Sequence, residues 1–215
     1  MYKRFYLALI LMLTFSSRIL AQSELPPTET ATLLTCATDT AEEPDTTMLT
    51  LMDFNEEQAF SCWANVNDGV MGGISESGFM PTDHGSGLFS GNVSLENNGG
   101  FASLQARFRA IDLSAFSGIE LTLCGDGQRY GFYLMYSLNR RLMYQGDFDT
   151  TAGVWQTIRL RFDELEARRF GQPVNANPLD TSKIVGMAFI ISDKQEGAFS
   201  LEVARISAWT EPLRV

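Results

Sequence analysis

All 18 glycines of this chain lie at or after Gly69, and between them apolar and polar residues alternate in short runs. Such runs, bounded by Gly, Asn and Asp, predict strands joined by tight turns. We predict nine strands, at residues 49–54, 87–95, 101–110, 118–123, 130–138, 142–148, 153–162, 184–191 and 199–208, and one or two helical turns at residues 163–169. This pattern indicates an all-β protein, with one domain folded as a jelly-roll β-sandwich.

Two of the predicted strands, residues 101–110 and 153–162, alternate clearly. One face of each is expected to be buried and the other solvated. The solvated faces carry two pairs of arginines, Arg107 and Arg109 on the first strand and Arg159 and Arg161 on the second. If the two strands are neighbours, these residues form a basic stripe that suits a carboxylate-bearing protein or an acidic glycan. The alternative is that each arginine pairs with a nearby Asp or Glu.

The first 48 residues differ from the remainder. Residues 1–21 have the pattern of a signal peptide, because Lys3 and Arg4 precede an apolar run and a small residue, Ala21, follows it. An uncleaved membrane anchor is the alternative. Residues 22–48 hold six acids and eight threonines but no base and no aromatic residue, which predicts a disordered spacer. We therefore expect an exported protein, periplasmic or secreted, with its folded domain at residues 49–215 and membrane contact only if the signal is uncleaved.

Acidic residues outnumber basic ones by 26 to 16, and the net charge is −10. No basic cluster is present that would bind nucleic acid. The chain has one histidine, His84, which argues against histidine-based metal or nucleophilic catalysis. No spacing singles out a catalytic pair of carboxylates. We therefore expect a protein that is not an enzyme, with no catalytic residues and no nucleic-acid partner.

A structural metal and a disulfide are weaker possibilities. We expect no cofactor, although Asp53, Glu56 and Glu211 could supply oxygen ligands to a structural Ca²⁺. Cys62 and Cys124 could form a disulfide in an oxidising compartment, or they could be buried free thiols; Cys36 makes the count odd.

Four segments together carry a resemblance to a known family. They are residues 63–75 (WANVNDGVMGGIS), 89–103 (FSGNVSLENNGGFAS), 125–130 (GDGQRY) and 192–202 (SDKQEGAFSLE). In this order and spacing they resemble the complex I intermediate-associated protein 30 family, over roughly residues 51–208. The resemblance implies a galactose-binding-like β-sandwich, similar to some carbohydrate-binding modules. Mitochondrial members of the family assist assembly of respiratory complex I and are not known as enzymes, whereas this chain carries an export signal.

We expect the motif residues to shape turns and core rather than to contact a ligand. They are Trp63, Asp68, Gly69, Met71, Gly72, Gly73, Asn97, Asn98, Gly99, Gly100, Phe101, Gly125, Asp126, Gly127, Asp193 and Gly197. Asp68 should bind backbone amides, Met71 should fill the core, and residues 97–100 should form a tight hairpin turn. An anion-binding loop at residues 68–73 is the alternative, but no Lys and no helix follows it.

Two functions remain open. The first is a non-catalytic, assembly-factor-like domain that binds a protein partner in the cell envelope. The second is a carbohydrate-binding module, in which Tyr130, Tyr133 and Tyr136 stack on sugar rings. Cross-strand packing is the alternative role for these tyrosines.

Overall fold

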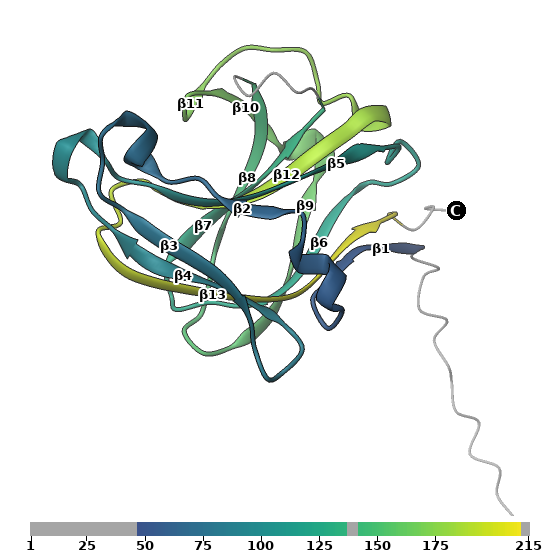
Figure 1. Ribbon diagram of the computed structural model, residues 1–215. Helices are drawn as coiled ribbons and strands as arrows, with labels where there is room; N and C mark the ends of the chain where they lie inside the picture. Colours follow the sequence, from purple (N-terminus) through teal and green to yellow (C-terminus); the bar gives the residue numbers. More distant parts are fainter. Residues whose placement is uncertain (1–46, 137–141, 212–215) are drawn as a thin grey trace, which may run out of the picture. The chain divides into compact units, whose positions relative to one another are not determined.

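The computed structural model describes residues 47–136 and 142–211 (Figure 1). The predicted signal peptide and residues 22–46 of the predicted spacer lie outside this part of the chain. The described residues form thirteen strands and five short 3₁₀ turns, without an α-helix. The strands make two antiparallel sheets that pack face to face, which is the β-sandwich expected from the alternating sequence.

The first sheet has six strands. Its order is β3 (Glu76–Pro81), β4 (Gly87–Val93), β13 (Gly197–Trp209), β6 (Gly118–Cys124) and β9 (Trp155–Arg161), and β1 (Met48–Asp53) also pairs with β13. β13 is long enough to hold two partners on one side, because β4 pairs with its first half and β1 with its second. β9 is the outermost strand of this sheet on the side of β6.

The second sheet has seven strands. Its order is β11 (Gln172–Pro173), β10 (Glu166–Arg169), β8 (Met143–Asp149), β7 (Arg129–Met135), β12 (Ile184–Ile191), β5 (Ala102–Ile111) and β2 (Trp63–Asn65). The inward faces of both sheets interdigitate to form the core. Phe132 on β7 and Phe189 on β12 meet edge to face at 5.0 Å between ring centroids, and Trp63 on β2 stacks on Phe189.

All nine predicted strands are present, with boundaries shifted by at most a few residues where the structure describes them. β2, β3, β10 and β11 were not predicted. The expected helical turns at residues 163–169 are largely wrong, since only Phe162–Glu164 forms a 3₁₀ turn and Glu166–Arg169 is β10, paired with β8. At the start of β1, Met48 pairs with Trp209.

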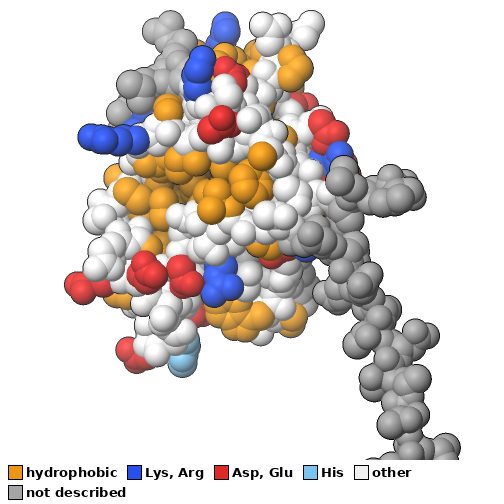
Figure 2. All heavy atoms as spheres, turned by 90° about the vertical axis from the view of Figure 1, so that its right-hand side faces the viewer, with side chains coloured by type: hydrophobic (Ala, Val, Ile, Leu, Met, Phe, Trp, Pro, Cys, Tyr) orange, Lys and Arg blue, Asp and Glu red, His pale blue; other side chains and the backbone are white. Residues whose placement is uncertain are grey.

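The surface of the described residues is not uniformly polar. Figure 2 shows hydrophobic side chains in a band across the end of the molecule that faces right in Figure 1. No helix in residues 47–136 and 142–211 is long and apolar enough to cross a membrane.

Candidate functional site

The four sequence motifs lie at one end of the sandwich, which we call the motif end and define as residues 66–75, 94–101, 125–128 and 192–197. In Figure 1 this end is on the left, where two short coils mark the 3₁₀ turns η2 (Asp68–Met71) and η3 (Glu96–Asn98). The loops at residues 94–101 and 125–128 both cross from the six-stranded to the seven-stranded sheet, since β4 and β6 are in the first and β5 and β7 in the second.

Asp68 ties two of these loops together. Its side chain is fully buried, and it accepts hydrogen bonds from the Ser75 amide at 2.9 Å, the Ser75 hydroxyl at 2.5 Å, the Gly100 amide at 2.7 Å and the Phe101 amide at 3.4 Å. Burial alone would raise the pKa of Asp68, but these hydrogen bonds outweigh burial and hold the pKa below its usual value. The expected role of Asp68 as an acceptor of backbone amides matches this geometry.

Four glycines lie in the loops around Asp68, and at each position either a close contact or the backbone conformation favours glycine. A Cβ at Gly73 would lie 2.4 Å from the Asp68 Cγ, and a Cβ at Gly99 would lie 2.6 Å from Oδ2 and 2.7 Å from the Ser94 carbonyl oxygen. Gly72 and Gly100 instead have φ of +94° and +128°, which favour glycine. The glycines therefore make room for the carboxylate and the turns around it. Gly69 has open space around it, and the structure does not explain its presence.

Two expectations about these loops are wrong. Asn97 and Asn98 do have positive φ, at 55° and 61°, but they lie in η3 and carry the chain between sheets instead of closing a hairpin. Met71 does not fill the core, because 62 % of its surface is exposed at the end of η2. The buried Asp68 side chain occupies the interior of this loop region.

Asp126 joins the other loops of the motif end. It accepts hydrogen bonds from the Ser200 amide at 2.8 Å and the Tyr130 hydroxyl at 3.0 Å, which connects β13 to β7. Gln195 bonds the backbone of Arg129 in both directions, accepting from its amide at 2.9 Å and donating to its carbonyl at 2.7 Å. The remaining turn positions, Gly127, Asp193, Lys194 and Gly197, all have positive φ. Hydrogen bonds from Asp68, Asp126 and Gln195 thus connect the loops of the motif end to one another and to the neighbouring strands.

The predicted basic stripe does not exist. Arg107 and Arg109 lie on β5 and Arg159 and Arg161 lie on β9, and these strands belong to opposite sheets. Both arginines of β9 are in ion pairs. Arg159 binds Glu120 at 2.7 Å and lies over the Trp209 ring, and Arg161 binds Asp163 and Glu211, which raise the pKa of its guanidinium.

The predicted tyrosine platform is also absent. Tyr130 and Tyr133 are 1 % and 2 % exposed, and Tyr136 packs against the core and edge to face with Tyr144. Burial raises the pKa of Tyr133 to about 12. Tyr130 therefore packs in the core between the sheets, whereas Tyr133 is buried in a separate cluster with Met135 and Ala188, which the alternation of β7 places on the other face of the strand. Packing, which is the alternative interpretation, accounts for the burial of both.

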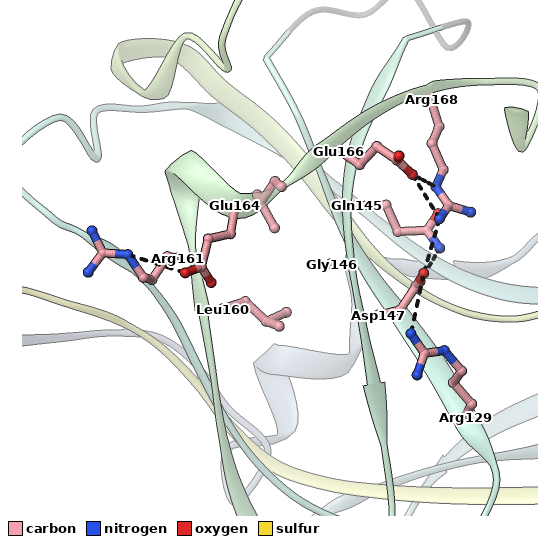
Figure 3. Close-up of a pocket in the computed structure, with 10 residues that line it drawn as sticks. Arg129, Gln145, Gly146, Asp147, Leu160, Arg161, Glu164, Glu166 and Arg168 are labelled. Carbon is pink, nitrogen blue, oxygen red and sulfur yellow. Dashed lines mark hydrogen bonds and ion pairs between the residues drawn. The ribbon is translucent and has the colours of Figure 1, made fainter. Parts of the chain in front are cut away.

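A charged cavity that sequence reasoning missed lies between β8, β9 and β10, and we call it the edge pocket (Figure 3). Its volume is about 230 Å³. Arg168 binds Asp147 and Glu166, both at 3.0 Å, and the Gln145 amide group donates to Asp147 at 2.6 Å. The available sequence signal was the alternation of Glu166, Ala167 and Arg168, which places both charged side chains on one face of a strand.

The other predicted groups do not assemble. Asp53 binds Arg205, whereas Glu211 lies at the opposite end of β1 and binds Arg161, so these acids do not share a Ca²⁺ site. Within the described residues, no group of three His, Cys, Asp or Glu side chains is placed to hold a metal ion. Cys62 and Cys124 are free thiols; Cys62 precedes β2, and Cys124 ends β6 in the other sheet. His84 is exposed in the β3–β4 turn.

Comparison with solved structures places the fold. A family 11 carbohydrate-binding module from Clostridium thermocellum, solved in complex with a beta-1,3-1,4-mixed-linked tetrasaccharide, superposes with a TM-score of 0.57 at 16 % identity, over 75 % of this chain and 94 % of the module. The agarase AgWH50C matches with a TM-score of 0.54 at 11 % identity, over 77 % of this chain and 25 % of the agarase. At such identities the likeness concerns the galactose-binding-like jelly-roll fold.

Comparison with sequences places the family. The mouse (Mus musculus) protein named "Complex I intermediate-associated protein 30, mitochondrial" is 25 % identical over 181 residues, which are 74 % of this chain and 55 % of the mouse protein. The chain therefore spans about half the length of that relative. The family model described as "Complex I intermediate-associated protein 30" matches residues 52–203, which include all four motifs and most of both sheets. The chain belongs to the complex I intermediate-associated protein 30 family.

Proposed function

We propose that this protein is a non-catalytic, assembly-factor-like domain that binds a protein partner. Family membership supports the proposal, because the curated mouse relative is named for its association with an assembly intermediate. The pattern of residues 1–21 supports export, and we propose a periplasmic or secreted protein with a partner in the cell envelope. Such a partner differs in compartment from that of the mitochondrial relative.

One observation carries the proposal. The polar side chains of the family motifs form hydrogen bonds within the protein. Asp68 accepts from the backbone of two loops, and Asp126 connects β7 to β13. A buried carboxylate whose oxygens already accept several hydrogen bonds has little capacity left for a substrate or small ligand. The motifs therefore build a shaped surface, which suits recognition of another protein.

Carbohydrate binding is the second candidate, and the edge pocket is the observation that favours it. Gln145, Asp147 and Arg168 line it with amide, carboxylate and guanidinium groups that hydrogen-bond one another, and the N–H donors of Arg168 that this network leaves over can bind the hydroxyls of a sugar. The weaker point is the burial of the tyrosines, which removes the predicted surface for stacking on sugar rings.

The two functions are separated by a direct comparison of binding. The purified full chain is electrophoresed through gels containing a soluble mixed-linked β-glucan, and tagged full chain is recovered from its native cells for identification of co-purifying proteins. We expect unchanged mobility in the glucan gel and one protein that binds the purified chain in a titration. Glucan retardation that is lost in Asp147→Asn, with no protein bound in titration, would refute the proposal and establish the alternative.

A further inference from the structure

Three large apolar side chains of the motif end face solvent. Met71 is 62 % exposed, Ile74 is 51 % exposed and Leu95 is 37 % exposed. Isolated exposed apolar residues are ordinary on soluble proteins, but apolar residues that gather on one surface mark sites of interaction. We call Met71, Ile74 and Leu95 the apolar knob. They mark an interaction site only if the fold holds them near one another.

Hydrogen bonds hold the knob together from beneath. Ile74 directly precedes Ser75 and Leu95 directly follows Ser94 in the chain. The Ser94 amide donates to the Ser75 hydroxyl oxygen at 2.9 Å, and that hydroxyl lies 3.3 Å from the Ser94 carbonyl oxygen and 2.5 Å from Asp68. The backbones that carry Ile74 and Leu95 are thus fixed side by side. Met71 is three residues before Ile74, across the turn that Gly72 and Gly73 make around Asp68.

The same scaffold keeps the knob from folding inward. Asp68 and the backbone around Gly73 and Gly99 already fill the space under the loops, where even one added carbon atom would clash. Ile74 and Leu95 are therefore held in solvent by a closely packed support, and Met71 lies on the adjoining turn. A surface that is ordered before binding loses less conformational entropy when a partner docks, which favours affinity.

Charge beside the knob indicates what kind of partner fits. Glu76 directly follows Ser75, and Glu96 directly follows Leu95. Both are exposed, and neither forms an ion pair with a described residue. A basic rim on a partner would complement them. An anionic lipid surface would be repelled by these acids and by the net charge of −10.

We propose that Met71, Ile74 and Leu95 form the docking surface of this protein, and that the partner is a protein with an apolar pocket rimmed by Lys or Arg. This inference rests on the proposed function, since it names the surface through which a protein partner would bind. It assigns the knob to recognition and assigns Asp68 and the motif glycines to positioning the knob.

The first experiment maps the contact in native cells that produce the full chain. The photo-crosslinking residue benzoylphenylalanine replaces Met71, Ile74 or Leu95, and in matched controls it replaces Leu49, Met80 or Phe170, which are exposed apolar residues outside the motif end. We expect one protein to crosslink from the three knob positions and not from the controls. Crosslinks from control positions alone would refute the docking surface and leave the proposed function standing. The absence of a protein crosslink from all six positions would refute the proposed function itself.

The second experiment uses the crosslinked partner in purified form. Ile74→Ser combined with Leu95→Ser should raise the Kd about 30-fold or more, as expected for apolar residues at the centre of an interface. Met80→Ser should leave the Kd within about twofold, and thermal melts should show that both variants fold. Glu76→Gln with Glu96→Gln should weaken binding at low salt and not at high salt. An unchanged Kd in the Ile74 and Leu95 variant would overturn the proposal.

A membrane is the competing target for an apolar knob, and vesicles test it. The full chain is sedimented with phosphatidylcholine vesicles that contain phosphatidylglycerol. We expect the chain to remain in the supernatant. Sedimentation of the wild-type chain that is lost in the Ile74 and Leu95 variant would assign the knob to lipid and overturn the protein-docking proposal.

Discussion

The motif end and the edge pocket use carboxylates in opposite ways. At the motif end, Asp68 is fully buried and binds backbone amides, while apolar side chains face solvent. At the edge pocket, Asp147 and Glu166 bind the Arg168 guanidinium near the surface. A fully buried carboxylate that replaces water around backbone amides holds the fold, whereas a partly exposed ion pair contributes less to stability because water competes for its charges. Both regions use carboxylates, so the difference in their roles comes from how completely each carboxylate is removed from water.

Removal of the charge from Asp68 tests this comparison most strongly. Asp68→Asn places an amide group where the carboxylate accepts from Ser75 and Gly100, so a donor meets a donor in a buried site. We expect a loss of about 3 kcal/mol in the free energy of unfolding, measured by urea denaturation. The matched control is Asp149→Asn, whose side chain is 75 % exposed in its ion pair with Arg129 and which should cost less than about 1 kcal/mol. Equal effects in the two variants would mean that burial does not decide how much a carboxylate stabilises this fold.

Filling the space beside Asp68 should have the next largest effect. Gly99→Ala would put a Cβ 2.6 Å from the Asp68 Oδ2 and 2.7 Å from the Ser94 carbonyl oxygen, so the backbone must shift. We expect a cost of about 1–3 kcal/mol, by thermal or urea unfolding. Gly69→Ala is the control in the same loop region, because nothing lies within 4 Å of its Cβ, and it should be close to neutral. A neutral Gly99→Ala would show that the loops under the knob are not rigid.

Acid should weaken the motif end through Asp68. Its folded-state pKa lies below its usual value, which is about 3.9 in unfolded chains, so its stabilisation is present above about pH 4 and is lost as the pH falls through the folded-state pKa. The difference in unfolding free energy between wild type and Asp68→Asn should therefore shrink between about pH 4 and pH 2. Urea denaturation at a series of pH values measures this difference. A gap that stays constant over that range would contradict the lowered pKa.

Alternation predicted the strands well, because it reports which face of a strand is buried. It failed for β3, where Gly78 and Pro81 interrupt the pattern, and for β10, which has four residues and whose one buried residue is the small Ala167. The arginine stripe failed for another reason: alternation shows that Arg107 and Arg159 point outward, but strand order decides whether they are neighbours. Met71 was expected in the core because of its apolar side chain, and only the geometry around Asp68 shows that it faces solvent.

The pairing of β1 with β13 sets the order in which this chain can be built. β1 begins at Met48 and β13 ends at Trp209, where the two residues are partners. At a synthesis rate of about 5–20 residues per second, the interval between the synthesis of Met48 and that of Trp209 is roughly 8–30 seconds. During that time β1 lacks the strand that it pairs with, and the six-stranded sheet cannot close before β13 has been made. Folding of this domain is therefore completed after synthesis of β13, and a chaperone that binds the nascent chain would have this interval in which to protect β1.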